Sequence, residues 1–450
     1  MNKKFSGLLS ASIAAALLTP SVAHATMGMD LIGFGAKSRG MGGIGVAYAQ
    51  DTLSISNNPA NAAKVGNRFD IGMEIFHPEM GVTHDSSLLP INDESEPASI
   101  GLGESRYEWF PMPFMGYAEE LNDDLSWGVA VVGTGLVTSY RQPENTFYNF
   151  EGKAGDKTGV YLIRMLFLPS IAYEVNDDVT VGASLVVAAQ GFKARGLEAF
   201  EELGFSAPSD TDKISHNQWD TGYGLGFRLG ALWNPIDEVT LGLNYSPRVN
   251  MSEFDDYSGL FAEQGDFDIA EEYSFGINVN LKNINISLEI QQVNYSDVKS
   301  IGNPGPNAAD PSDFNPLCPG VDTPDCLLGG DKGMGFGWTD QTRIRLGGDF
   351  QYSDKLTLRA GWAYAEAPIE KDQVLFNFLA PATTENNLTF GASYQYSPTM
   401  EISVNYLHGF ENVISGPTAF TPEGQAPVEN ANGSIGMVQN AIGAMLGMKF

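Results

Sequence analysis

Apolar residues recur at every second position along most of the chain that follows residue 67. Val179, Val181, Ala183, Leu185 and Val187 alternate with small or polar residues, and the stretches 239–246 and 273–281 show the same period. Because successive side chains of a β-strand point to opposite faces, this period predicts strands with one apolar face. The chain is therefore expected to be all-β, although a sandwich could show the same alternation.

The connections between these segments favour a barrel over a sandwich. Fourteen segments have the pattern of strands, and the thirteen connections alternate between short, turn-rich ones, as at 282–283, and long ones, as at 300–337. An even number of antiparallel strands with short turns on one side and long loops on the other is typical of an outer-membrane β-barrel. A closed barrel is also the strand architecture that satisfies all main-chain groups in lipid. The predicted strands are 67–84, 107–119, 125–139, 161–174, 178–193, 217–233, 238–249, 271–281, 284–297, 340–352, 355–366, 385–396, 400–410 and 438–450.

Aromatic residues support the same class of protein. The chain ends at Phe450, and the alternate residues from Met448 back to Ile442 are apolar or small, as in a last transmembrane strand. Several aromatic residues lie near predicted strand ends, where a membrane interface favours them: Trp127, Tyr173, Trp233, Tyr245, Tyr352 and Tyr396.

The charge of the chain excludes several classes of partner. The 55 acidic and 25 basic residues give a formal net charge of −30. Such a surface opposes nucleic acid, because it has no surplus of cations to replace phosphate counterions. No run of about 20 apolar residues is present beyond the N-terminus, so a bundle of transmembrane helices is excluded too. In a barrel, much of the negative charge would lie in external loops and turns.

Residues 1–25 are expected to be a secretory signal peptide. Lys3 and Lys4 precede a short apolar stretch, and Ala23-His24-Ala25 has the form of a cleavage site. The exported chain would meet an oxidising compartment, in which Cys318 and Cys326 are expected to form one local disulfide.

The sequence predicts neither a metal site nor a cofactor. The histidines are scattered, and the eight acidic residues between 253 and 272 do not have the spacing of an EF-hand loop. Calcium binding by this acidic stretch and a solvated external loop are both open, and the loop is favoured.

Residues 26–66 do not alternate and are rich in glycine. Gly40, Gly42 and Gly45 match the dinucleotide-binding fingerprint formally, but that motif requires a preceding strand and a βαβ unit. Small residues at this density instead suit a compact plug whose main chain approaches the barrel wall closely. The predicted organisation is a signal peptide (1–25), a hatch (26–66) and a transmembrane barrel (67–450).

Two runs in this segment carry a family resemblance. GAKSRGMGGIGVA (35–47) and DTLSISNNPANAA (51–63), together with the terminal Phe450, resemble the FadL/TodX (OmpP1) family of outer-membrane transporters for hydrophobic compounds. The resemblance continues through strand motifs such as WNPIDEVTLGLNY (233–245) and covers nearly the whole mature chain.

The resemblance implies a monomeric fourteen-stranded barrel in the outer membrane, in contact with its lipid and lipopolysaccharide. It also implies a hatch whose Asn58-Pro59-Ala60 lies close to an inward kink of the third strand, and lateral release of the substrate at that kink. The kink would fall at Gly133, Thr134 and Gly135, where glycine weakens pairing. Relatives carry a different pair here, and the glycines could instead merely ease barrel curvature.

Candidate residues for substrate contacts can be named if the protein transports hydrophobic compounds, as the resemblance implies. An external apolar groove would gain about 25 cal/mol per Å² of apolar surface removed from water. Arginines that face the lumen could hold the carboxylate of a fatty acid, or could pair with wall carboxylates such as Glu289 or Asp349. The groove candidates are Leu197, Phe200, Leu203, Phe205, Leu260 and Phe261, with the alternative that they form the loops' own core, and the headgroup candidates are Arg164, Arg343 and Arg345.

The favoured function is transport of hydrophobic small molecules, most of all long-chain fatty acids. The alternatives are uptake of aromatic hydrocarbons, a general porin, or an outer-membrane lipase or protease. An enzyme would need a nucleophile and a base near the rim. Ser403 and His408 occur on one predicted strand, but no G-x-S-x-G motif is present.

Overall fold

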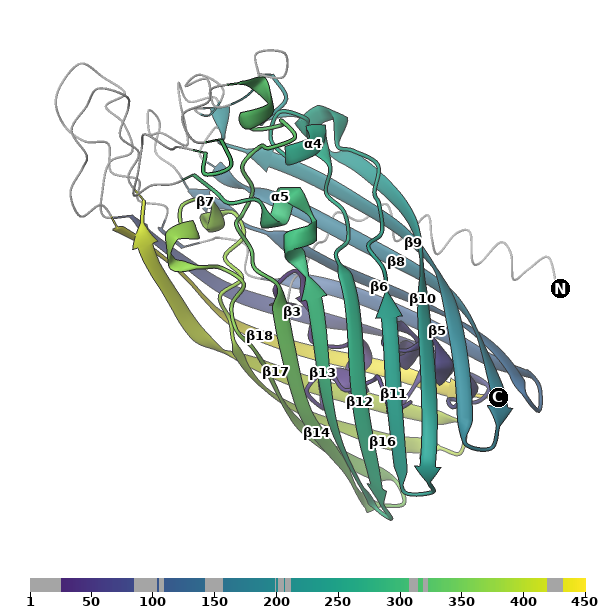
Figure 1. The fold of residues 1–450 in the computed structure, drawn as a ribbon. Helices are drawn as coiled ribbons and strands as arrows, with labels where there is room; N and C mark the ends of the chain where they lie inside the picture. Colours follow the sequence, from purple (N-terminus) through teal and green to yellow (C-terminus); the bar gives the residue numbers. More distant parts are fainter. Residues whose placement is uncertain are drawn as a thin grey trace, which may run out of the picture.

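A closed antiparallel β-barrel forms the body of the molecule. The computed structural model describes residues 26–84, 103–104, 109–141, 157–198, 200, 206, 212–306, 315–318, 323–418 and 432–450. Each barrel strand pairs with its neighbour in the chain, and the last strand, β18 (Asn432–Lys449), pairs with the first, β3 (Arg68–His84), from Gly433↔His84 to Lys449↔Arg68. Figure 1 shows the tilted barrel with its ordered external connections at the upper end.

Fourteen strands make up the wall, as the alternation predicts. Between β3 and β18 they are β5 (Phe110–Asn122), β6 (Leu125–Val137), β8 (Lys157–Asn176), β9 (Val179–Arg195), β10 (Asp220–Ile236), β11 (Val239–Ser246), β12 (Glu271–Leu281), β13 (Ile284–Asn294), β14 (Gln341–Ser353), β15 (Leu356–Ala365), β16 (Asn386–Ser397) and β17 (Met400–Pro417). The largest differences from the predicted bounds are at β17, which extends to Pro417 rather than 410, and at β18, which begins at Asn432 rather than 438. In the other direction, β11 ends at Ser246 rather than 249.

The two ends of the barrel differ as expected for this class. At the periplasmic end, each of the six turns between paired strands leaves two residues outside the strands, as at Asp123-Asp124 and Lys282-Asn283. At the other end, the connections contain short elements: β4 (Gly103–Glu104), β7 (Tyr140–Arg141), η4 (Asp255–Tyr257), α4 (Ala262–Gly265), η5 (Tyr295–Asp297), α5 (Lys299–Gly302), η7 (Pro324–Cys326), η8 (Lys371–Gln373) and η9 (Phe376–Phe378). None of the described helices is both long enough and apolar enough to span a membrane.

The two faces of the wall carry different residues. Large apolar side chains that alternate along the strands are exposed on the outer face, for example Met73 (48%), Leu243 (58%) and Ile442 (58%). Inward positions carry small, polar or charged residues, such as Ser184, Asn244 and Arg345, all buried. This division suits an outer surface in lipid and a lumen filled by protein.

The N-terminal segment (residues 26–66) fills the periplasmic half of the lumen. It contains the strands β1 (Thr26–Met27) and β2 (Asp30–Leu31), the helix α2 (Gly35–Arg39) and the 3₁₀ helices η1 (Thr52–Ser56) and η2 (Pro59–Ala63). In Figure 1 it is the purple chain inside the barrel. All five residues of α2 and of η1 are buried, although several of them are polar.

Glycines allow this segment to touch the wall through main-chain atoms. A Cβ added at Gly361 of β15 would lie 2.3 Å from the Gly42 nitrogen, and one at Gly347 of β14 would lie 2.2 Å from the Met41 carbonyl oxygen. Gly42 itself has φ = +74°, a region that glycine adopts without strain. The close approach expected from the glycine-rich run is therefore present on both partners.

The external connections pack a core of their own over the barrel mouth. It contains the aromatic groups Phe192, Phe254, Phe261, Phe378 and Trp338, each at most 5% exposed. Residues from the strand ends and from several connections contribute to it, so the described loops form one packed layer.

The fit between segment and wall predicts an effect of one added methyl group. Gly361→Ala forces its Cβ against the main chain of Met41 and Gly42, and overpacking of this kind costs about 1–3 kcal/mol. We expect a lower temperature of thermal unfolding and faster trypsin cleavage after Lys37 and Arg39, which are buried in the native chain. The control is Gly81→Ala in β3, because a Cβ there meets no atom within 4 Å. Equal behaviour of the two variants would contradict the close fit.

Candidate functional site

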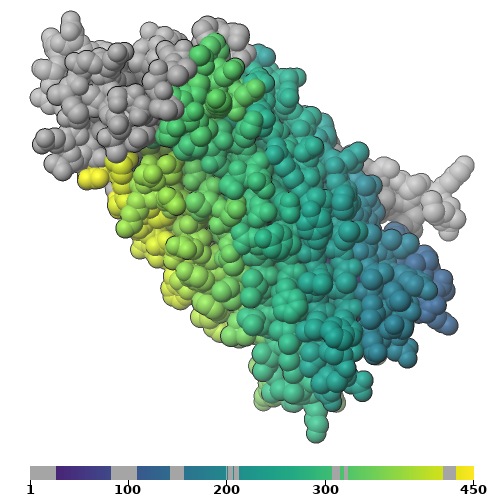
Figure 2. All heavy atoms as spheres, viewed as in Figure 1, coloured from purple at the N-terminus to yellow at the C-terminus, as the bar shows by residue number. Residues whose placement is uncertain are grey.

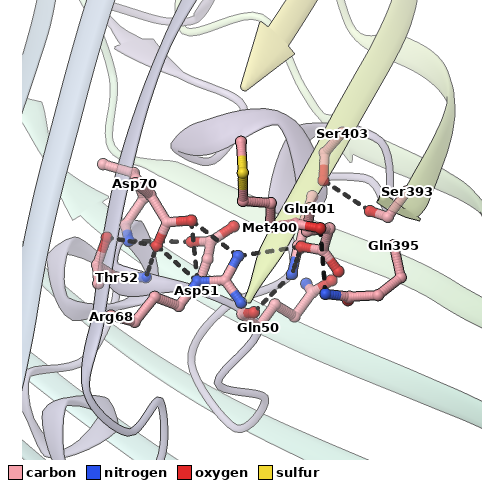
Figure 3. A network of polar contacts seen from close by, with 12 residues as sticks. Gln50, Asp51, Thr52, Arg68, Asp70, Ser393, Gln395, Met400, Glu401 and Ser403 are labelled. Atoms are coloured by element: carbon pink, nitrogen blue, oxygen red, sulfur yellow. Dashed lines mark hydrogen bonds and ion pairs between the residues drawn. The ribbon is translucent and has the colours of Figure 1, made fainter. Parts of the chain in front are cut away.

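Buried ion pairs fasten the N-terminal segment to the periplasmic end of the barrel. Arg68 Nη2 of β3 lies 2.8 Å from Asp70 Oδ1 and 3.0 Å from Glu401 Oε1 of β17. Lys37 Nζ of α2 shares the same Glu401 oxygen at 2.5 Å. The main-chain N–H and the hydroxyl of Thr52 both donate to Asp70 Oδ2, at 3.0 and 2.8 Å, and Figure 3 shows this network. Because the charges are paired and hydrogen-bonded, they can be buried here.

A second anchor involves the Asn58-Pro59-Ala60 motif. The side-chain oxygen of Asn58 accepts from Ala60 N at 3.0 Å and caps η2, and its amide donates to Val46 O at 2.8 Å and to Ala231 O of β10 at 3.2 Å. A Cβ at Gly230 would overlap Asn58. The structure thus places the motif against β9 and β10. The hydrogen bond between this segment and residues 133–135 is donated by Thr134 to the carbonyl of Met29, as described below.

The wall contains a break in strand pairing between β5 and β6. Their ladder ends at Met115↔Val131, while β5 stays paired with β3 up to Phe76↔Phe110 and β6 with β8 up to Val137↔Tyr161. In these described strands, residues 110–114 of β5 and 132–137 of β6 therefore lack a ladder pair with each other. Gly133, Thr134 and Gly135 lie in this unpaired part of the third strand. The neighbouring outward residue Met73 is 48% exposed, so the break lies within the apolar band.

Two prolines explain why the pairing stops on the β5 side. Pro111 and Pro113 face outward, between the buried, inward-facing Phe110, Met112 and Phe114. β5, β8 and β10 are descending strands, which run from the external end of the barrel to the periplasmic end. In β8 and β10, inward-facing residues donate their main-chain hydrogen bonds toward the preceding strand: Glu174 N–H to Asp124 O and Asn234 N–H to Asp178 O, both at 2.8 Å. Outward residues of a descending strand therefore direct their N–H groups toward the following strand. At Pro111 and Pro113 that direction is toward β6, and proline has no N–H to offer.

The tip of the N-terminal segment covers the break from inside. Thr134 Oγ1 of β6 donates to Met29 O at 2.8 Å. Met27, Leu31 and Ile32 pack in one apolar cluster that also contains residues from both sides of the break: Phe110 and Met112 of β5 and Val137 of β6.

Arg343 of β14 holds this tip in place. Its Nη2 donates to Met27 O at 2.6 Å and lies 2.9 Å from Asp30 Oδ2. Burial would raise the pKa of Asp30, but the charge and hydrogen bond of Arg343 lower it below its ordinary value, so that Asp30 is ionised at neutral pH. Tyr295 completes the contact, because its hydroxyl accepts from Met29 N at 3.0 Å and from Arg343 at 2.7 Å. We name Asp30, Tyr295 and Arg343 the tip clamp.

An internal cavity of about 60 Å³ lies beside the tip clamp. Four buried arginines line it, together with apolar groups such as Leu166 and Val293: Arg164, Arg228, Arg343 and Arg345. A cavity needs about 10–15 Å³ of such volume to hold one water molecule, so this one has room for a small polar group.

The four arginines differ in their partners. Arg343 pairs with Asp30, Arg228 Nη2 with Glu272 at 2.7 Å, and Arg345 Nη1 with Glu289 at 3.8 Å. Arg164 donates to Gln190 Oε1 at 3.4 and 3.3 Å, and within the described ranges no carboxylate oxygen lies within 4.0 Å of its nitrogens. Of the three headgroup candidates, Arg164 is therefore the one without a described acidic partner.

The predicted groove residues are buried within the loop layer. Leu197, Phe200 and Phe261 are at most 5% exposed and belong to its core, and Leu260 packs against them. Leu203 and Phe205 lie outside the described residues. In this conformation, the described members are closed off from solvent.

The disulfide lies outside the cavity lining, whereas Asp268 and Glu272 of the acidic stretch contribute to it. Cys318 and Cys326 form a disulfide in the connection between β13 and β14. In the acidic stretch, Arg248 lies 3.2 Å from Asp266 and 2.6 Å from Asp268. Burial and the neighbouring Asp268 raise the pKa of Asp266 to about 7. No group of three potential metal ligands is present among the residues that the structure describes.

Ser403 and His408 do not form a catalytic pair. Their positions on β17 differ by an odd number, so they face opposite sides of the wall. Ser403 Oγ is 2.7 Å from Ser393 Oγ, and His408 Nδ1 is 2.9 Å from Asn440 Oδ1.

Sequence reasoning missed four residues at this site. Pro111 and Pro113 form a signal that could have been read, because two prolines at alternate positions cannot both lie in a fully paired strand. Asp30 and Tyr295 carried no such signal, since only the fold brings them to Arg343.

A closed barrel with a filled lumen and a covered break in its wall defines the class as an outer-membrane transport barrel. The family model described as outer membrane protein transport protein (OMPP1/FadL/TodX) matches residues 22–437, and the chain belongs to this family. Its place is the outer membrane, and its family transports hydrophobic compounds and is not a family of enzymes.

Solved structures show the same fold at low sequence identity. The Pseudomonas putida toluene transporter TodX is 18% identical, with a TM-score of 0.65, and the match covers 94% of this chain and 99% of that one. A Pseudomonas aeruginosa FadL homologue is 14% identical, with a TM-score of 0.64 and coverage of 94% and 100%. A Chlorobium limicola protein, described as an uncharacterized protein in the 5′ region of the phosphoenolpyruvate carboxykinase gene, is 36% identical over 83 residues. That match spans 18% of this chain and 39% of the curated protein.

The buried acid pair formed by Asp51 of the N-terminal segment and Asp70 of β3 predicts a pH dependence. Burial and the neighbouring Asp70 raise the pKa of Asp51 from 3.8 to about 6. The folded chain then holds this proton more tightly than the unfolded chain does, so this group's contribution to stability falls as pH rises from 3.8 through about 6. Asp51→Asn removes the charge and keeps an oxygen for the hydrogen bond from Leu53 N.

The measurement is the difference in unfolding temperature between Asp51→Asn and the unmodified chain at about pH 4 and pH 7. We expect the variant to gain relative stability at the higher pH. Asp123→Asn, in an exposed turn, is the control and should follow the unmodified chain at both values. A difference that does not change with pH would refute the raised pKa.

Proposed function

We propose that this protein carries long-chain fatty acids across the outer membrane and releases them sideways through the β5–β6 break. The observation that carries the proposal is the position of this break within the apolar band, above a periplasmic lumen filled by the N-terminal segment. A solute that leaves through the break enters hydrocarbon directly and avoids the periplasmic water below. Burial of its chain gains about 25 cal/mol per Å² of apolar surface.

Capture would begin in the external loop layer. Leu197, Phe200 and Phe261 are buried there, so the loops must part before these side chains can bind an alkyl chain. Leu203, Phe205 and Leu260 are proposed to belong to the same groove. The aromatic packing of this layer is held by dispersion and apolar burial rather than by ion pairs, and an apolar solute can replace such contacts with similar ones.

The N-terminal segment is proposed to act as a hatch that controls the break. Its tip closes the inner side of the break through Met27, Leu31 and the bond from Thr134 to Met29. The tip clamp holds the tip from the opposite side of the cavity. Loss of the tip clamp would free the tip, while the ion pairs around Arg68 keep the rest of the segment in place.

Arg164 is the proposed partner of the substrate carboxylate. It lies in the wall of the cavity, next to the tip clamp, without a described acidic partner. The cavity volume of about 60 Å³ suits a carboxylate, and the alkyl chain would extend along the apolar residues toward the loops. Arg343 and Arg345 already contact Asp30 and Glu289, so their role is to hold the hatch and the wall.

An aromatic hydrocarbon is the second candidate substrate. The similar solved structure of TodX is named as a toluene transporter, and this favours a small aromatic solute. Such a solute has no carboxylate for Arg164, so the two substrates make opposite predictions for that residue.

Replacement of both prolines of β5 should close the break. Pro111→Val with Pro113→Val restores two N–H donors toward β6 and adds residues that favour strands. We expect uptake of labelled oleate by cells that produce this variant to fall about ten-fold, since the extended ladder removes the exit. Pro169→Val, at another outward proline in β8, is the matched control. Unchanged uptake by the double variant, with folded barrel present in the membrane, would rule out lateral release between β5 and β6.

Removal of the charge of Arg164 should separate the two substrates. We expect Arg164→Gln to weaken oleate binding by about ten-fold, the loss of one hydrogen bond to a charged group, and to leave toluene binding unchanged. Arg195→Gln at the external end of β9 tests for a general effect of charge. Equal oleate affinity in all three proteins would refute the headgroup role, and loss of toluene binding as well would show a structural effect.

A further inference from the structure

A second irregularity of the wall lies where β11 leaves it. β10 has 17 residues, whereas β11 has 8, and the ladder between them ends at Leu229↔Tyr245. Residues 220–228 of β10 therefore extend beyond the last pair, and Figure 1 shows the arrow of β11 ending well short of the external loops. A hollow in the outer face is lined by this last pair and opens toward lipid, and Figure 2 views this face in teal. We name the part of the wall between residues 220–228 and the end of β11 the second break.

A proline again explains why the pairing stops. The register of the ladder would place Pro247 opposite Phe227, as the next outward-facing pair after Leu229 and Tyr245. Outward residues of these two strands exchange their N–H and C=O groups, and proline has no N–H to offer. Among the described residues, no main-chain hydrogen bond joins Phe227 to the chain that follows Ser246. At this level, β10 therefore has no strand paired with it on the β11 side.

The second break lies in the external half of the apolar band. A tilted strand crosses the hydrocarbon in about 9–11 residues. On β10, the exposed aromatic residues Trp233 and Tyr223 stand about that far apart, as residues of the two interfacial girdles do. Leu225 and Phe227 lie between them, nearer to Tyr223, and are 70% and 48% exposed. The second break therefore borders hydrocarbon on its outer side.

A short piece of chain covers the second break from inside. We name residues 247–251, which turn into the lumen, the strap. A Cβ at the inward-facing Gly226 of β10 would lie 2.6 Å from Val249 Cγ2, and Val249 is 1% exposed. One main-chain bridge, Gly224↔Met251, joins the strap to β10. The strap thus closes the second break mainly with an apolar side chain.

The polar contacts of the strap are made with the acidic stretch. Val249 exchanges main-chain hydrogen bonds with Ile269 at 3.0 and 3.1 Å. Arg248 Nε lies 2.6 Å from Asp268 Oδ2, and Met251 N donates to Asp268 Oδ1 at 2.6 Å. Because these bonds join the strap to residues 266–269, the two segments can leave the second break together without loss of any pair in the β10–β11 ladder.

The internal cavity lies on the inner side of the strap. Its lining includes Arg228 of β10 and Ser246 of β11, which stand at the edge of the second break, and Ile269, which pairs with the strap. The same cavity reaches Thr134 at the β5–β6 break. One cavity therefore lies between two covered places in the wall, of which the tip covers one and the strap covers the other.

We propose that the second break is a second side opening, through which the cavity exchanges hydrophobic solute with the hydrocarbon of the outer membrane when the strap moves. The proposal rests on the transport function proposed above, but the second break is a passage separate from the β5–β6 break. A strand that continued β11 would seal this place with hydrogen bonds to β10. The strap seals it with the side chain of Val249, and an apolar solute can replace such a contact with a similar one.

A disulfide between strap and wall tests this passage. Gly226→Cys with Val249→Cys places the two Cβ atoms about 3.4 Å apart, close to the range of natural disulfides. The pair is made in the unmodified chain and in the Pro111→Val, Pro113→Val variant, in which the β5–β6 break is expected to be closed. Uptake of labelled oleate by cells is measured after oxidation with copper phenanthroline and again after reduction with dithiothreitol. The two single-cysteine variants, treated alike, are the controls.

We expect oxidation to lower uptake by the proline variant with the cysteine pair about ten-fold, because the second break is its remaining passage, and reduction to restore it. In the chain with both prolines the fall should be smaller. Equal uptake before and after a crosslink that has formed would overturn the proposal and leave release at β5–β6 untouched. Uptake that the proline changes leave intact but the crosslink abolishes would refute release at β5–β6 and support the second break.

A variant with the opposite effect covers the case in which the cysteine pair does not fold or does not crosslink. Val249→Gly removes the side chain that lies over Gly226. We expect it to raise oleate uptake by the proline variant about three-fold, because the cover of the second break is thinner. Unchanged uptake, with folded barrel present in the membrane, would also overturn the proposal.

Discussion

The hydrogen-bonding demand of the main chain in hydrocarbon governs the architecture of this protein. Every N–H and C=O group at membrane depth needs a partner, and the ladder that closes β18 onto β3 removes the free edges of the sheet. A break in that ladder is costly unless the groups it frees are absent or covered. The β5–β6 break uses both solutions, since Pro111 and Pro113 have no N–H and the tip of the N-terminal segment lies behind.

The tip that covers the break connects the N-terminal segment in the lumen to the barrel wall. The tip occupies its place because Arg343, Tyr295 and Asp30 hold it, and the charges concerned are buried and hydrogen-bonded to one another. The ion pair between Arg343 and Asp30 resists spontaneous opening, because a buried charge that loses its partner is strongly destabilised. A second carboxylate could replace Asp30 as that partner, so the contact is sensitive to a substrate that carries one. A substrate headgroup at Arg164 would lie next to this contact, so binding and release can be coupled within one small cavity.

Much of the fold could be predicted from the sequence, and much less of the site. A period of two along a strand depends on the local contrast between lipid and lumen. The fourteen strands, the positions of the short turns and the inward direction of Arg164 could therefore be predicted from neighbouring residues alone. The pairing of Arg343 with Asp30 joins positions more than 300 residues apart, and no local pattern encodes it. The inward turn after Ser246 could not be predicted either. Residues 247–249 continue the alternation of a strand, but tertiary contacts of Val249 with Gly226 and Ile269 direct the chain into the lumen.

The two irregularities of the wall differ in their strand pairing. At the β5–β6 break the pairing is lost and protein covers it from inside, so passage requires the cover to move. Beside the end of β11 the ladder with β10 remains intact through Leu229↔Tyr245, and the hollow on the outer face there opens toward lipid. The acidic surplus fits this division, because the exposed outer face is nearly free of charge while many of the carboxylates lie in turns and loops. Glu74, Glu289 and Glu401 are exceptions in the strands, and each contacts a basic residue or main-chain N–H of the N-terminal segment. Charge is thus kept within the membrane span where it fixes the N-terminal segment, and the lipid-facing surface is left to apolar contacts.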